Sequence, residues 1–230
     1  MMELVAGKCI AAWRKAWRES SGPTVRLLRF LYEPASHMWP GRLLKIFPDR
    51  KCIDLLSSGR RGWLLFNDRI REQLRLKENC EFPTFEERHK LIYERAELLL
   101  RLELFIGSAL FSENVRLVVR RGNLDALMEK LGEEIYSFAL RKAVFFQAHG
   151  LPVPLQEFQS LPLPERIACA GRWCVAACIA DLPEAILERF ALKFPEEEKW
   201  KFPTPMDGES VSQLWQFVQR VLRRCGEGGA

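Results

Sequence analysis

The cysteines and histidines are the residues of this sequence best suited to metal binding or catalysis, but they form no complete pattern. Cys174 and Cys178 lie four residues apart on one face of an expected helix, with Cys169 close by. A zinc site normally takes four ligands, with spacings such as C-x-x-C. The neighbouring residues are alanine, isoleucine and valine, so buried free thiols are a better interpretation than a thiolate cluster. The three histidines are scattered, and none has a second ligand at helical spacing.

A glycine–arginine turn, "SSGRRGW", is the next candidate, because converging glycine amides can bind phosphate. A phosphate-binding loop also needs a G-K-[ST] sequence after a strand, which this stretch lacks. Arg60 and Arg61 could contact a phosphate or a carboxylate, although a basic turn is the commoner role. Carboxylate pairs such as Glu133 and Glu134 are typical of solvated faces, and no G-x-S-x-G nucleophile motif occurs. We therefore predict a protein that is not an enzyme and takes no metal or cofactor.

The stretch "RFLYEPASHMWPGRLLKIF", residues 29–47, interrupts the helical pattern. Pro34 and Pro40 break helicity, so residues 30–47 are expected to form an elbow between helices. Proline lowers the ordering cost of binding, which makes the elbow a candidate docking feature. Its candidate contacts are His37, Trp39 and Arg42. Packing of Trp39 against the core is an equally good interpretation, because tryptophan serves cores and interfaces alike.

Apolar residues recur at helical spacing along most of the chain, and almost nothing alternates with period two. This predicts an all-α fold, a single compact multi-helix domain over residues 1–230 with a proline-containing N-terminal elbow. Short helices need one another's apolar faces, which favours one compact domain over a solenoid. Trp13 and Trp17 share a face of the first expected helix, and Pro183 separates a C-terminal helical pair. The expected parts are a basic N-terminal part (1–78), central and C-terminal helices (84–225) and a flexible tail (226–230).

Capping patterns predict where individual helices begin. Thr84 and Glu87 form a capping box that would start one long helix reaching Phe111. The second half of that helix is apolar on nearly all sides, which is typical of a central helix surrounded by others. Ser210 and Gln213 give the last amphipathic helix a second capping box.

The net formal charge of +5 is distributed unevenly. Residues 1–78 hold 16 Lys and Arg against 8 Asp and Glu, whereas residues 79–230 hold 19 against 22. The basic excess of the front third could attract an acidic partner. A helical nucleic-acid-binding or regulatory protein is therefore an alternative interpretation. However, acidic residues interrupt the basic ones throughout, and no RNP or zinc-finger pattern occurs.

The sequence also bears on location. No apolar run approaches the ~20 residues needed to cross a bilayer. Glu3 stands where a secretory signal would have a basic region, and Lys8 interrupts the apolar stretch that follows. Seven cysteines without a framework spacing favour reduced thiols. We expect a cytosolic protein without direct membrane insertion.

Three segments resemble, in order along the chain, the type III secretion accessory proteins of the SctK family, the YscK and PscK type. The first, "RFLYEPASHMWPGRL", is similar to the family's proline-containing motif, with His37 where tyrosine is expected. The second is "LFIGSALFSENVRLVVRRGNLDALMEKLGEEIYSFALRKA", residues 104–143, which is similar to the family's central region. The third is "LPLPERIACAGRWCVAACIADLPEAILERFALKFP", which is similar to its C-terminal helical pair.

The resemblance implies a non-enzymatic cytosolic adaptor of the injectisome sorting platform, needed for effector export. Its partners would be the cytosolic domain of an SctD-like inner-membrane ring protein and an SctQ-like pod protein that resembles a C-ring. The assembled protein would lie at the cytosolic face of the bacterial inner membrane. Arg60 and Arg61 are then candidates for contact with an acidic ring domain. Trp200, and Trp215 in the last helix, are candidates for contact with the other partner.

Overall fold

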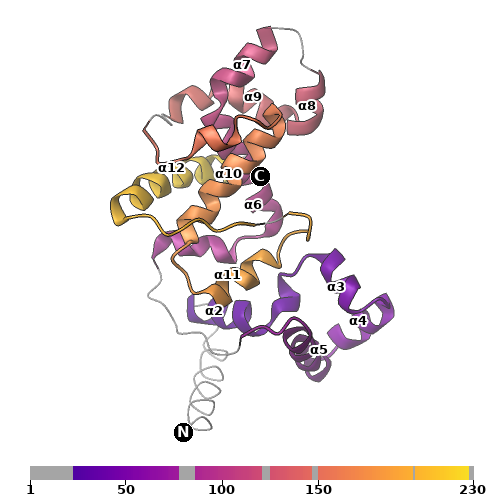
Figure 1. The fold of residues 1–230 in the computed structure, drawn as a ribbon. Helices are drawn as coiled ribbons and strands as arrows, with labels where there is room; N and C mark the ends of the chain where they lie inside the picture. Colours follow the sequence, from indigo (N-terminus) through magenta and orange to yellow (C-terminus); the bar gives the residue numbers. More distant parts are fainter. Residues whose placement is uncertain (1–22, 78–85, 121–124, 147–149, 199, 228–230) are drawn as a thin grey trace. The chain divides into compact units, whose positions relative to one another are not determined.

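Every regular element in the part of the chain described by the computed structural model is helical (Figure 1). The described residues are 23–77, 86–120, 125–146, 150–198 and 200–227. The all-α prediction is confirmed, while the expected first helix with Trp13 and Trp17, and residues 228–230 of the expected tail, lie outside these ranges. Two compact units share the chain: residues 1–83 with 183–199, and residues 84–182 with 200–230. The single-domain organisation stays a prediction, and each unit is described by itself.

The first unit is built from short helices joined by tight turns. Its elements are α2 (Pro23–Tyr32), the 3-10 helix η1 (Pro34–Ser36), α3 (Pro40–Ile46), α4 (Arg50–Ser57), α5 (Arg60–Gln73) and α11 (Glu184–Ala191). Pro34 and Pro40 each occupy a first-turn position of a new helix, where a missing amide hydrogen costs nothing. The expected elbow is therefore two consecutive helix starts.

Apolar residues from the elbow, α5 and the segment after α11 form the core of the first unit. One buried cluster of this core contains Met38, Phe66, Ile70, Leu76 and Leu192. Arg189 of α11 is also buried, and its guanidinium donates to the backbone oxygens of Leu31, Ala185 and Lys77 at 3.0, 2.7 and 2.8 Å. One side chain thus ties three segments together, because a buried guanidinium must have its donors satisfied.

The second unit contains the longer helices. Its elements are the 3-10 helix η2 (Glu87–Tyr93), α6 (Ala96–Leu110), α7 (Ser112–Arg120), α8 (Asp125–Leu131), α9 (Glu133–Arg141), the 3-10 helices η3 (Ala143–Phe146) and η4 (Leu155–Phe158), α10 (Leu163–Ile179) and α12 (Gly208–Glu227). Pro183 lies between α10 and α11, as the sequence predicts. Leu131 is buried at the end of α8.

The closest helix packing in the second unit joins α6 and α10 (Figure 1). A Cβ atom at Gly107 would lie 1.9 Å from the carbonyl oxygen of Ile167, and one at Gly171 would lie 1.8 Å from that of Glu103. Only glycine allows two helix backbones to approach this closely. The buried Glu103 carboxylate accepts two bonds from the Arg172 guanidinium, at 3.1 and 3.2 Å, so its charge is paired inside this contact.

The prediction of one long helix from Thr84 to Phe111 is wrong. Thr84 lies outside the described residues, η2 is a 3-10 helix, and the backbone is extended at Glu94 and Arg95 before α6 begins. Arg88 and His89, neighbours in sequence, both bond to Asp181. These bonds attach η2 to a residue that follows α10, a contact that local sequence patterns do not encode.

The start of the last helix also differs from the prediction. The Ser210 amide and hydroxyl donate to the Asp207 carboxylate at 2.9 and 2.7 Å, so Asp207 caps α12 and Ser210 already lies inside it. These bonds hold the pKa of Asp207 below its ordinary value. A carboxylate also interacts more favourably than a hydroxyl with the positive end of the helix dipole.

Candidate partner-binding surfaces

The elbow faces inward more than its sequence suggests. The Ala35 amide donates to the side-chain oxygen of Asn67 at 2.9 Å, and the Asn67 side-chain nitrogen donates to the Trp63 carbonyl at 2.8 Å. Asn67 is buried in α5, so these bonds attach the elbow to that helix. The backbone amide of Trp39 donates to the Leu192 carbonyl at 2.8 Å. The elbow is therefore held by hydrogen bonds on both sides.

His37 is part of this inward-facing arrangement. Its ring stacks on Phe30, with ring centroids 4.6 Å apart. Its Nε2 atom is enclosed and finds no hydrogen-bond partner among the described residues. Burial, followed by the charges of Lys193 and Arg189, lowers the pKa of His37 to about 3. His37 is thus a neutral packing residue at neutral pH.

Arg42 and Trp39 are half-buried. The Arg42 Nε atom donates to the Phe194 carbonyl at 2.7 Å, and a second guanidinium nitrogen lies 3.4 Å from the Pro195 carbonyl. The indole of Trp39 covers Gly41, where an added Cβ would lie 3.3 Å from it. The structure brings the three elbow candidates together, and the Arg42 guanidinium and the Trp39 backbone amide already have partners within the first unit.

Helices α4 and α5 form a tight hairpin in the same unit (Figure 1). A Cβ at Gly62 would lie 2.5 Å from the backbone oxygen of Leu56, so glycine sets the closeness of the two helices. Trp63, Phe66 and Ile70 of α5 pack toward the unit's core. The opposite side of the hairpin is consequently free to face away from the core.

That side carries exposed arginines and leucines in pairs. Arg60 and Leu64 lie four residues apart on α5, as do Arg61 and Leu65, and residues at this spacing are neighbours on a helix surface. Leu64 is 41% exposed and Leu65 64% exposed. We call these four residues the Arg–Leu face. Neither arginine of this face has an ion-pair partner among the described residues.

The two arginines also occupy the first turn of α5, which contains no acidic residue. A positive charge there opposes the helix dipole and costs about 0.3–1 kcal/mol. An acidic partner would remove this penalty by bringing negative charge to the helix start. The Arg–Leu face is therefore chemically suited to a partner that combines acidic and apolar groups.

The two tryptophans expected to meet another partner lie in the second unit and are not equivalent. Trp200 is only 9% exposed, with the Arg172 guanidinium 5.8 Å from its ring centroid. Trp215 of α12 is half-buried. Trp200 therefore offers little surface to a partner, whereas Trp215 retains some.

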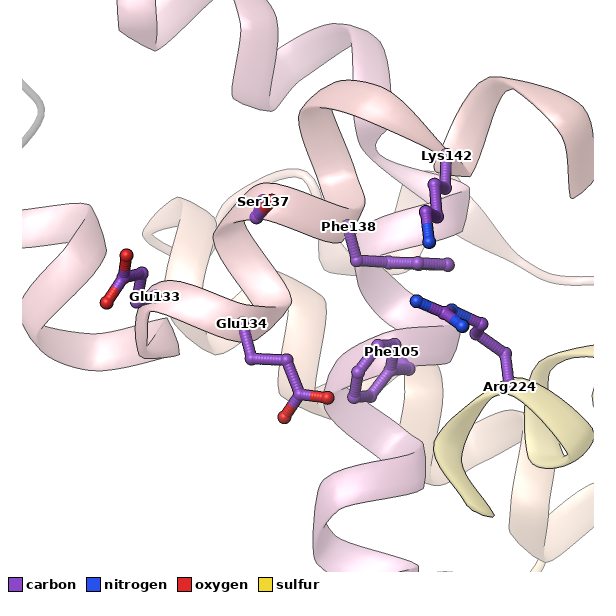
Figure 2. A pocket seen from close by; sticks show the side chains of 7 residues that line it. All are labelled: Phe105, Glu133, Glu134, Ser137, Phe138, Lys142 and Arg224. Atoms are coloured by element: carbon purple, nitrogen blue, oxygen red, sulfur yellow. The ribbon is translucent and has the colours of Figure 1, made fainter. Parts of the chain in front are cut away.

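Figure 2 shows a pocket of the second unit, between α6, α9 and the end of α12. Its volume is about 450 Å³, and Phe105 and Phe138 form its apolar wall. Lys142 and Arg224 point toward one another beside Phe138, while the carboxylates of Glu133 and Glu134 lie toward the other end. Glu134 is paired with Arg101, so the two ends of the pocket differ in available charge.

The sequence did not predict two exposed apolar features of these surfaces. The leucines of the Arg–Leu face are one, although their spacing from Arg60 and Arg61 is visible in the sequence. The exposed Phe145 of η3 carried no such signal, because exposure of an isolated aromatic residue depends on packing.

The described residues contain no group of three His, Cys, Asp or Glu side chains placed to hold a metal ion. Cys174 and Cys178 are buried free thiols, and burial raises the pKa of Cys178 to about 12. None of the described helices combines the length and apolar character that membrane crossing requires.

A protein-family model matches most of the chain. The family described as YOP proteins translocation protein K (YscK) matches residues 32–224. No curated protein and no solved structure gives a match. The matched range begins within the elbow region and ends in α12, so it includes elements of both units. The chain therefore belongs to the YscK (SctK) family of type III secretion proteins.

Proposed function

We propose that this type III secretion protein is a non-enzymatic cytosolic adaptor that links the inner-membrane ring to the C-ring-like pod protein. Membership of the YscK family supports a role in protein translocation. The partners proposed are the cytosolic domain of an SctD-like ring protein and an SctQ-like pod protein. The assembled adaptor would lie at the cytosolic face of the inner membrane, where its loss would stop effector export.

The Arg–Leu face is the observation that carries this proposal. It presents two cations and two apolar side chains on one helix surface, without ion-pair partners among the described residues. Electrostatic attraction gives such a surface its on-rate and specificity, and burial of the leucines adds affinity. We assign the Arg–Leu face to an acidic surface of the ring protein.

The elbow then has a supporting role. Its bonds to Asn67 and to the residue 192–195 segment hold α3 and α5 in place. Partner contact is assigned to the exposed part of Trp39, with His37 and Arg42 acting from beneath. Trp215 is retained as a weaker candidate for the pod protein.

Co-purification tests the proposal. The full chain is mixed separately with the ring domain and with the pod protein, and each mixture is analysed by size-exclusion chromatography. We expect a complex in both cases. The Arg60→Glu/Arg61→Glu variant should lose the ring complex and keep the pod complex.

A matched control separates local contact from net charge. Arg26→Glu/Lys130→Glu makes the same change in net charge at two exposed positions outside the Arg–Leu face, and it should bind both partners normally. Failure of the unmodified chain to bind either partner contradicts the adaptor role. Bacteria that lack the chain yet still export effectors would contradict it independently.

A further inference from the structure

The 3-10 helix η3 exposes an apolar pair that lies outside the Arg–Leu face and the elbow. Phe145 is 76% exposed and Val144 51% exposed, the former being the most exposed of the large apolar side chains described. An exposed phenylalanine next to a second apolar residue is a frequent mark of an interaction site. The backbone of η3 is held in place, since the Arg220 guanidinium donates to the Phe146 carbonyl at 3.3 Å.

Positive charge surrounds this pair. Lys142 immediately precedes η3 and lines the pocket of Figure 2 together with Arg224. Lys142 is exposed and has no ion-pair partner among the described residues. Arg220 is exposed beside η3 as well. We call Lys142, Val144, Phe145 and Arg220 the η3 patch.

The pocket beside the η3 patch is a concave site that can receive a side chain of a partner. A volume of about 450 Å³ accommodates one or two side chains and falls in the range of ligand sites. Its wall is formed by Phe105 and Phe138, whose rings meet edge to face at 4.8 Å. Lys142 and Arg224 converge at one end, where a carboxylate would relieve their mutual repulsion.

We propose that the η3 patch and this pocket bind an acidic segment of a partner protein that carries a phenylalanine or leucine side chain. The apolar side chain of the segment packs on Phe145 and enters the pocket. Its carboxylates face Lys142, Arg220 and Arg224. The proposal deepens the adaptor role by supplying a binding surface in the second unit, and it depends on the proposed function only in expecting a second protein partner.

An anionic membrane surface is the other class of binder that matches exposed phenylalanine and basic residues. One observation favours a protein: a flat bilayer cannot fill a concave pocket, whereas a single side chain can enter it. The test below includes vesicles so that this outcome is seen directly.

The experiment uses the full chain and three synthetic peptides of twelve residues. The probe peptide is rich in glutamate with one central phenylalanine and one leucine. One control peptide replaces both apolar residues by serine, and the other replaces glutamate by lysine. Binding is followed by amide NMR of the protein, and vesicles of phosphatidylglycerol and phosphatidylcholine are tested by co-sedimentation.

We expect saturable shifts confined to Phe105 and its neighbours, residues 133–146 and residues 220–225, caused only by the probe peptide. Lys142→Glu and Phe145→Ser should each weaken binding at least tenfold. Their matched controls, Lys130→Glu and Leu117→Ser, change exposed residues of α8 and α7 and should leave binding unchanged.

Several results would overturn the inference. These are absence of binding, equal binding of the serine peptide, or equal weakening by the control variants. Vesicle binding that depends on Phe145, without peptide binding, would replace the protein partner by a membrane. None of these outcomes bears on the ring complex, because that complex is assigned to the Arg–Leu face of the first unit.

Discussion

The elbow and the Arg–Leu face belong to the same unit and differ in how they use similar residues. The elbow places an arginine, a histidine and a tryptophan within six residues, but Arg42 bonds to backbone oxygens and His37 stacks on Phe30. The Arg–Leu face has two arginines and two leucines, all exposed. The polar and aromatic residues of the elbow thus bond mainly within the first unit. The Arg–Leu face of α5, in contrast, is open to a partner.

The difference has a physical origin. Two prolines create helix starts that lack side-chain caps, and the Ala35 and Trp39 amides instead bond to Asn67 and to the Leu192 carbonyl, which lie far away in the sequence. Helix α5 satisfies its own backbone, so its outer side chains need no internal partner. The comparison predicts that elbow substitutions change stability, whereas substitutions on the Arg–Leu face change binding.

The largest stability effect of a substitution at neutral pH is expected at Asn67. Replacement by leucine removes the acceptor of the Ala35 amide and leaves a half-buried donor without a partner. Asn67→Leu should lower the free energy of unfolding by about 3 kcal/mol. Urea denaturation measures this change, and Gln73→Leu, at an exposed amide on the same helix, should stay within about 0.5 kcal/mol. A small effect at Asn67 would show that the elbow is only loosely attached.

Acid should weaken the elbow through His37. Its folded-state pKa of about 3 lies below an unfolded value of about 6.5, so the unfolded chain binds the proton first. Stability therefore falls as the pH drops from about 6.5 toward about 3, by about 1.4 kcal/mol per pH unit from this group. Urea denaturation of His37→Phe at several pH values should give a correspondingly flatter profile. Identical profiles for both proteins would mean that His37 is open to solvent.

Arg42 should have a smaller effect. Arg42→Ala removes the bonds to the Phe194 and Pro195 carbonyls at a half-buried site, which should cost about 1 kcal/mol. Thermal unfolding measures the change. The control is Arg26→Ala, an exposed arginine of α2 in the same unit. An unchanged melting temperature for Arg42→Ala would show that the Arg42 side chain is available to bind a partner protein.

The sequence alone predicts the helical class and many helix boundaries. Proline at position 183 marks the start of α11, and the all-sided apolar character of residues 99–110 marks a central helix. The η2 turn and the Asp207 cap could not be predicted in this way. The start of α12 depends on whether Asp207 or Ser210 bonds to the free amides there. The η2 turn depends on bonds to Asp181, which lies about ninety residues away.

The candidate contact residues show the same division between local properties, which the sequence predicts, and long-range packing, which it does not. Arg60 and Arg61 are exposed in the structure, as a basic turn suggests, and the spacing to Leu64 and Leu65 was available from the sequence. The inward orientation of Arg42 and the burial of Trp200 could not be predicted, because both depend on segments distant in sequence. The exposure of Phe145 is likewise a result of packing.

The most direct test of the adaptor account is the affinity of the SctD-like ring domain for the Arg60→Glu/Arg61→Glu variant, measured by calorimetry together with the variant's melting temperature. The account predicts an affinity at least tenfold below that of the unmodified chain, with a melting temperature that is equal or higher, because glutamate suits the start of α5 better than arginine does. Equal affinity of the two proteins for the ring domain would contradict the assignment of the Arg–Leu face as its docking surface.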